Sequence, residues 1–153
     1  MTAVVHELAD FKPTDVHCQT LGESLFDRTR MQWAGYTFID TGDVVFKAYW
    51  CKYLKNYLAD PEGAADRERY SLMLLVHEAM HVRGERNEQK TECQAIQRHY
   101  RTALLLGVPE RLARLHSVKN YREQYPRHPY YSAACKPDSE WDEKLSDSTW
   151  NFL

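Results

Sequence analysis

One stretch of the sequence decides how this chain folds, and it reads Leu72-Met73-Leu74-Leu75-Val76-His77-Glu78-Ala79-Met80-His81. The apolar run before His77 predicts a helix that is buried on most sides. In a helix one turn separates His77 from His81, so both imidazoles leave the same face and can reach a single metal ion. Zinc is the metal that this pair of ligands favours.

Glu78 follows the first histidine directly, and its presence indicates catalysis rather than metal binding alone. A zinc ion lowers the pKa of a bound water towards about 7, and a carboxylate beside it can take the proton as the water attacks an amide. We therefore expect Glu78 to be the catalytic general base. The alternative, a helix with two histidines on a solvated face, agrees less well with the apolar run, because buried ionisable groups need partners.

The residues after His81 predict a tight helical hairpin. Gly84 can end the first helix in a left-handed cap, and Asn87 is a suitable N-cap for a second helix. The residues that would share one face of this second helix, turned back towards the two histidines, are Glu88, Glu92, Ile96 and His99.

This block resembles the zincin metallopeptidases, and within them the gluzincins, where a second helix supplies a glutamate as the third ligand. Thermolysin-like members have Asn-Glu-x-x-Ser-Asp at the point where this chain reads Asn87-Glu88-Gln89-Lys90-Thr91-Glu92. The match implies that His77, His81 and Glu88 hold the zinc ion, and that Glu92 orients a ligand histidine through its second nitrogen. The interval from His81 to Glu88 is shorter than in thermolysin, so Glu92 stays open as an alternative ligand.

The block is also similar to small bacterial and phage-associated metallopeptidases that cleave repressors. These have a ligand glutamate, a polar residue four positions later and an alanine seven positions later, as Glu88, Glu92 and Ala95 stand here. The resemblance covers residues 70 to 99. It implies an α+β fold in which a small antiparallel sheet packs on the histidine helix and the ligand-bearing helix that follows, with one zinc ion and a peptide or protein substrate.

Other zincin patterns and the remaining site residues stay open. The residues from His77 to Asn87 nearly match the metzincin signature, but Asn87 is a poor zinc ligand and no methionine follows the motif. His99 is a possible distant third ligand, as in another zincin branch. A tyrosine or histidine usually stabilises the oxyanion in such sites, and we take His99 and Tyr100 as first candidates among Tyr70, His99, Tyr100, His116, Tyr130 and Tyr131.

The composition sets the frame for these expectations. A chain of 153 residues, 43% of them hydrophobic, suits one globular domain over residues 1–153. Residues 126–153, with several prolines and acidic residues, predict an irregular C-terminal tail. The net charge of -2 gives no support for a nucleic-acid or membrane partner. The oligomeric state is not readable from the sequence.

Two features bear on the compartment. The first residues lack the basic and apolar regions of a signal peptide, and no stretch approaches the length of a membrane span, so we expect a cytoplasmic protein. An even number of cysteines permits two disulfides in three pairings. In the absence of an export signal we expect thiols at Cys18, Cys51, Cys93 and Cys135.

The rest of the chain predicts short strands before the helical hairpin. We expect strands over residues 16–20, 35–40 and 44–50, the last two joined by a turn. The strand over 44–49 is our candidate for the edge that would pair with an extended substrate, and an ordinary core strand is the alternative at this position. A short helix over 54–58, the histidine helix from about residue 64 to 67 onward, and a helix over 110–124 complete the prediction.

The sequence thus favours a zinc metallopeptidase. The alternative from another class is a zincin-fold binding module that keeps its zinc without hydrolysing anything, and a metal-free helical scaffold is the third interpretation.

Overall fold

The histidine motif lies in α4 (Asp66–Arg83), the helix around which the rest of the protein is arranged. We describe a computed structural model that covers residues 1–27 and 33–153. It confirms the α+β class. The other elements are α1 (Thr2–Leu8), β1 (Asp15–Cys18), α2 (Leu21–Phe26), β2 (Gly35–Phe38), β3 (Asp43–Phe46), α3 (Ala48–Ala59), α5 (Glu88–Leu105), α6 (Glu110–Lys119), a π-helical turn (Asn120–Gln124) and 3-10 helices (Tyr125–Arg127, Thr149–Phe152).

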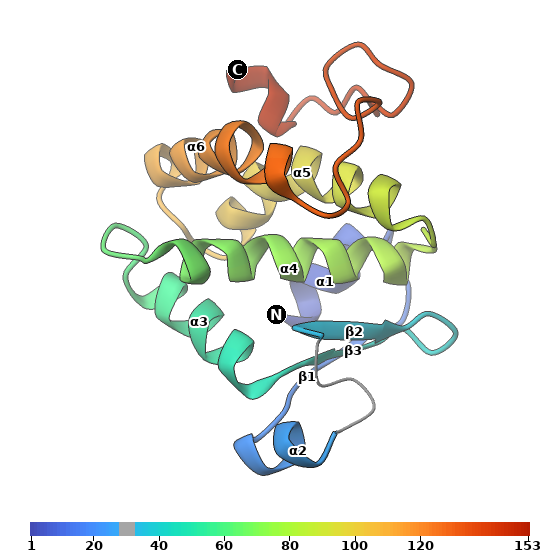
Figure 1. Ribbon diagram of the computed structural model, residues 1–153, viewed down its shortest axis with the longest axis vertical. Helices are drawn as coiled ribbons and strands as arrows, with labels where there is room; N and C mark the ends of the chain where they lie inside the picture. The colour runs from blue at the N-terminus through green and yellow to red at the C-terminus, as the bar shows by residue number, and fades with distance from the viewer. Residues whose placement is uncertain (28–32) are drawn as a thin grey trace.

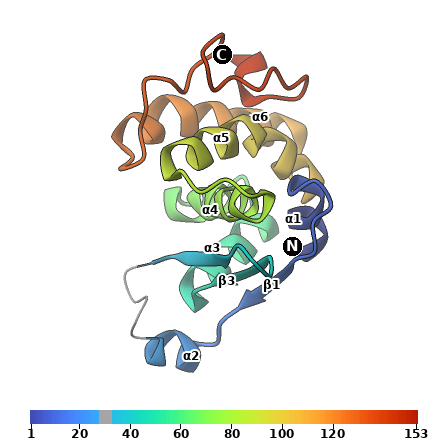
Figure 2. The same ribbon diagram turned by 90° about the vertical axis from the view of Figure 1, so that its right-hand side faces the viewer.

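The elements stack in layers, with α4 in the middle (Figure 1). The small sheet lies against one side of α4, and α5 and then α6 cover the other side, as the view at right angles also shows (Figure 2). The C-terminal chain crosses the outer face of α5 and α6. This arrangement buries α4 from two sides and leaves the end that carries the histidines between the sheet and α5.

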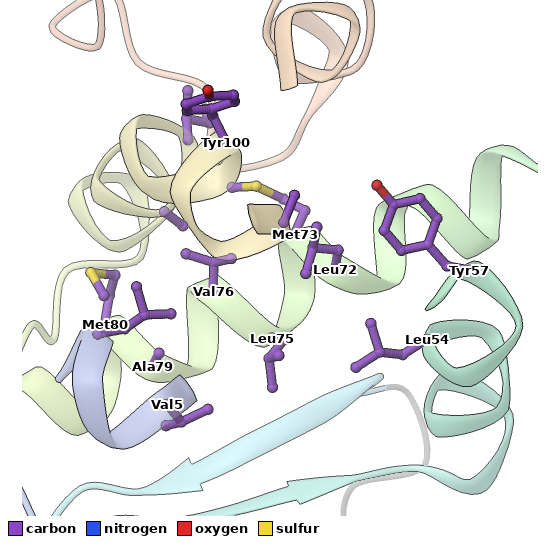
Figure 3. Packing of buried hydrophobic residues seen from close by; sticks show 14 of the residues in the cluster. Val5, Leu54, Tyr57, Leu72, Met73, Leu75, Val76, Ala79, Met80 and Tyr100 are labelled. Carbon is purple, nitrogen blue, oxygen red and sulfur yellow. The ribbon is translucent and has the colours of Figure 1, made fainter. Parts of the chain in front are cut away.

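Burial of α4 follows from its apolar run. The side chains of Leu72, Met73, Leu75 and Val76 are all fully buried. Figure 3 shows Leu75 directed towards the sheet and Val76 towards α5, so apolar residues leave the helix on both sides. Burying one such side chain contributes about 1.5 to 3 kcal/mol. The prediction of a helix buried on most sides is confirmed.

The sheet is mixed, whereas the sequence predicted an antiparallel one. Its strand order is β1-β3-β2. The turn at residues 39–42 joins β2 and β3 as an antiparallel hairpin, as predicted. The chain between β1 and β3 passes through α2 and β2, and β3 then runs parallel to β1. The edge role for the strand over 44–49 is wrong and the alternative of a core strand is confirmed, because β3 is the central strand and β1 and β2 are the edges.

The segment after β3 becomes helical earlier than expected. Residues 48–50, predicted as strand, form the first turn of α3, and the predicted short helix over 54–58 is part of this longer element. The reason is a buried helical stripe of Cys51, Leu54 and Tyr57, spaced three residues apart, which packs on α4. The predicted helix over 110–124 is confirmed as α6 and the π-helical turn that continues it.

The four cysteines form two disulfide bonds, so the expectation of thiols is wrong. Cys18 in β1 pairs with Cys51 in α3, and Cys93 in α5 pairs with Cys135 in the tail. The Cα atoms of the two pairs lie 5.8 Å and 5.5 Å apart, within the usual span of a cystine. The expectation rested on the composition of the first residues, which carries no information about which cysteines the fold brings together.

The chain beyond α6 has little regular structure. In the described chain after Gln124, the helical segments are the two 3-10 helices at 125–127 and 149–152. In Figure 1 the orange segment after α6 descends towards α4 before the chain rises to its C-terminus. In the part of the chain that the structure describes, no helix combines the length and the apolar character needed to cross a bilayer.

Candidate metal centre

The second half of α4 brings two histidines to one place. The helix starts with the backbone N–H of Ala65 donating to the Glu68 carboxylate at 2.8 Å, which caps its first turn. His77 and His81 then follow one turn apart, with their ring centroids 4.9 Å from each other. Both side chains are buried.

Glu88 reaches the same point from the start of α5. Gly84 adopts a left-handed conformation (φ 117°) that ends α4, and the side chain of Asn87 accepts a hydrogen bond from the backbone N–H of Lys90 at 3.0 Å, which caps α5. The tight turn between them sets the first residue of α5 beside the histidines. Glu88 Oε2 lies 3.1 Å from His77 Nε2 and 3.5 Å from His81 Nε2.

These three groups offer one ligand atom each within 4.8 Å of one another. The remaining ring nitrogens are held by other partners: His77 Nδ1 lies 2.7 Å from Glu92 Oε2, and His81 Nδ1 lies 2.8 Å from the backbone carbonyl of Glu85. Histidines that bind metals are commonly oriented in this way, with one nitrogen hydrogen-bonded and the other turned to the metal. The donor set therefore fits a zinc ion.

The charges of the cluster are balanced by direct contacts. Burial alone would lower the pKa of His77, but hydrogen bonds to Glu88 and Glu92 outweigh it and raise the pKa to about 10. The hydrogen bonds from His77 and His81 hold the pKa of Glu88 well below its usual range. Protons on the two histidines thus hold the cluster together through hydrogen bonds to the glutamates. A bound metal ion would replace the protons on the nitrogens that it contacts, since a metal binds neutral imidazole.

Glu78 lies beside this cluster and is 4% exposed. Its burial raises the pKa of its carboxyl, and the charge of His77 and a hydrogen bond from Thr37 partly offset this rise. Thr37 belongs to β2, so the sheet contacts the predicted general base directly.

A cleft of about 500 Å³ opens over these residues. Residues 34–37 of β2 and its approach line one wall, and the histidine face of α4 lines the floor. Glu88 and Glu92 of α5 lie on the opposite side, together with residues 128–130 of the tail. An elongated chain of several residues is the kind of ligand that such a cleft between an outer strand and a helix can hold.

The tail contributes residues that sequence reasoning largely missed. His128 Nε2 lies 2.8 Å from the Tyr70 hydroxyl, and His128 Nδ1 lies 3.6 Å from Glu92 Oε1. The ring of Tyr130 stacks on that of His77, with a centroid distance of 5.8 Å and an interplanar angle of 20°. Tyr130 was among several open candidates, whereas His128 was not singled out. The only signal was the run of aromatic and histidine residues in a segment predicted to be irregular.

The first candidates for oxyanion stabilisation lie elsewhere. His99 and Tyr100 do not line the cleft. An α-helix rises about 1.5 Å per residue, so position 99 lies roughly 16 Å further along α5 than Glu88. His99 is fully buried, neither of its ring nitrogens has a hydrogen-bond partner within the described chain, and burial lowers its pKa to about 3. The Tyr100 hydroxyl instead donates to Glu110 at 3.4 Å.

We compared the chain with models of known protein families, with curated protein sequences and with solved structures, and none of these comparisons returned a match. The resemblance to the zincins therefore depends on the motif residues alone.

Proposed function

We propose that this protein is a zinc metallopeptidase that hydrolyses peptide bonds with Glu78 as its general base. The observation that carries the proposal is the convergence of His77 Nε2, His81 Nε2 and Glu88 Oε2 at one point. The positions of the second nitrogens add support, because they favour Glu88 as the third ligand and Glu92 as the residue that orients His77.

When bound, a zinc ion would supply Lewis-acid chemistry by lowering the pKa of a water molecule and polarising a carbonyl group. Glu78 would take the proton from the attacking water and pass it to the departing amine, since its carboxylate borders the cleft beside the ligands. Its burial keeps bulk water away from the proton during the transfer.

Tyr130 is our candidate for stabilising the oxyanion. It lines the cleft and stacks on His77. A phenol has an ordinary pKa of about 10 and so keeps its proton at neutral pH, and burial raises the pKa of Tyr130 further. A neutral phenol can donate a hydrogen bond to an oxygen that gains negative charge. A peptide substrate would lie in the cleft beside β2, not beside β3 as the sequence suggested.

The compartment is also a matter for proposal. The first residues favoured a cytoplasmic protein, but two cystines are more typical of an oxidising compartment, where disulfide bonds persist. We propose that the protein works in such a compartment.

The test combines metal analysis with hydrolysis of a quenched fluorescent peptide library. We expect one zinc ion per wild-type chain, and loss of both zinc and hydrolysis in His77→Ala. Glu78→Gln should keep the zinc and lose about 100- to 10,000-fold in rate, the usual contribution of a general base. A wild-type protein that holds zinc and cleaves nothing would favour the non-catalytic binding module, and one purified without stoichiometric zinc would favour the metal-free scaffold.

A further inference from the structure

The carboxylate of Glu78 is held by a residue far away in the sequence. Thr37 Oγ1 donates to Glu78 Oε2 at 2.7 Å, and the same hydroxyl lies 3.2 Å from the backbone carbonyl of Glu78. Because a hydroxyl has one proton, the shorter contact with the carboxylate is the stronger hydrogen bond. The bond joins β2 to α4 across 41 residues of sequence.

The two oxygens of this carboxylate have different surroundings. Oε2 accepts the hydrogen bond from Thr37, whereas Oε1 faces Gly35, two residues earlier on the same side of β2. A Cβ atom at Gly35 would lie 3.6 Å from Oε1 and 3.0 Å from the backbone carbonyl of Val45. The missing side chain thus leaves space over Oε1. No described residue donates a hydrogen bond to Oε1, so Oε1 is the oxygen that remains available to accept a proton from water.

From this geometry we propose that Thr37 is a positioning residue, which fixes Glu78 by one oxygen so that the other is presented to the cleft. This inference rests on the proposed peptidase function. Thr37 acts through Glu78 and is not itself a catalytic residue. A general base must lie within about 2.6 to 3.2 Å of the proton it takes, and a displacement of about 1 Å can lower the rate on the order of 100-fold.

A purely structural role for the same bond makes a different prediction. If Thr37 only ties the sheet to α4, its removal lowers stability and leaves turnover per folded molecule intact. If it positions Glu78, removal of its hydroxyl lowers kcat while zinc content and KM stay the same, because the ligands are untouched and a side chain of the same shape still lines this wall of the cleft.

The test uses Thr37→Val, which keeps the shape and removes the hydroxyl, and Thr37→Ser, which keeps the hydroxyl. Thr41→Val is a matched control, because Thr41 Oγ1 donates to the Asp43 carboxylate at 2.7 Å at the far end of the same hairpin. We would measure kcat and KM on the fluorescent peptides, zinc per chain, and the crystal structure of each variant.

We expect Thr37→Val to lose about 10- to 100-fold in kcat, with KM within about twofold of wild type and zinc retained. Thr37→Ser should restore most of the rate, and Thr41→Val should match wild type. In a Glu78→Ala background, Thr37→Val should cause no further loss, since a positioning residue has no effect without the group it positions. The crystal structures should show the Glu78 carboxylate rotated away in Thr37→Val alone.

The inference is overturned if Thr37→Val turns over like wild type, if Thr41→Val loses as much, or if the loss persists in the Glu78→Ala background. The crystal structures separate this inference from the peptidase proposal. If the wild type cleaves no peptide, the peptidase proposal fails by itself, and an unmoved Glu78 in Thr37→Val would still overturn the positioning role.

Discussion

Glu88 and Glu92 lie one turn apart on α5 and meet opposite edges of the same imidazole. Glu88 lies at His77 Nε2 and Glu92 at His77 Nδ1. The two side chains also differ in burial, since that of Glu88 is 46% exposed at the cleft whereas that of Glu92 is 4% exposed. Partial exposure at the cleft suits Glu88 as a metal ligand at an open site. Burial suits Glu92 as the carboxylate that fixes the orientation of the His77 ring.

We predict that Glu92→Gln weakens zinc binding about 10- to 100-fold, because the neutral amide holds the Nδ1 proton of His77 less firmly. Glu88→Gln should abolish stoichiometric zinc. Competition with a chromophoric chelator measures both affinities. The control is Glu62→Gln, the same change at an exposed site that pairs with Arg111. The reverse order, with zinc lost in Glu92→Gln and kept in Glu88→Gln, would exchange the two assignments.

Single residues were predictable from the sequence where a helix fixes their spacing. His77, Glu78 and His81 needed only the geometry of one turn. Glu88 came from the resemblance to the gluzincin pattern, because the hairpin that Gly84 and Asn87 mark left Glu88 and Glu92 both open. His128 and Tyr130 were not predictable in this way. They reach the site through a segment without periodicity, whose course depends on long-range contacts such as the bond from the Gln89 amide to the carbonyl of Tyr131 at 3.1 Å.

At the scale of elements, the helices were predicted better than the sheet. A helix is determined by local spacing, so α4, α5 and α6 follow from apolar periodicity and caps. The hairpin of β2 and β3 was also local. The parallel pairing of β1 with β3 was not, because it joins residues 28 positions apart in register, from Asp15 with Asp43 to Cys18 with Phe46. The sequence of a strand does not indicate which distant strand pairs with it.

The cap of α5 links an element to the site, since Glu88 is the first residue of that helix. We predict that Asn87→Ala destabilises the protein by about 1 kcal/mol in urea unfolding, because it removes the acceptor for the Lys90 N–H. Zinc affinity should fall as well, since the first turn of α5 becomes less ordered. Asn87→Ser is the control that keeps a capping oxygen and should stay within a few tenths of a kcal/mol of wild type. A loss of similar size in Asn87→Ser would contradict the capping role.

At the scale of the whole molecule, the interior between α5 and α6 contains two histidines that favour the neutral form. Burial lowers the pKa of His99 to about 3 and that of His116 to about 4. An unfolded chain binds these protons at about pH 6.5. Below that pH the unfolded state therefore takes up more protons than the folded state, and stability falls with decreasing pH.

We predict that the free energy of unfolding decreases below about pH 6.5 by up to about 1.4 kcal/mol per pH unit for each of these histidines. His99→Leu should make the decrease shallower and leave stability at pH 7 unchanged or higher, because it also removes two buried nitrogens that have no hydrogen-bond partner among the described residues. Urea unfolding between pH 7 and pH 4.5 measures the free energy of unfolding, and a chelator keeps the protein free of metal so that metal release at low pH does not contribute. His17→Leu, at an exposed strand position, is the control, and an unaltered pH dependence in His99→Leu would refute the argument.

The two cystines have a consequence for how the chain responds to a cut by a protease. One closes a loop from Cys18 to Cys51 and the other a loop from Cys93 to Cys135. A single nick inside either loop leaves both fragments covalently joined. The first loop contains Thr37 and the second contains Tyr130, so a cut in either loop would leave both of these cleft-lining residues covalently attached to the rest of the chain.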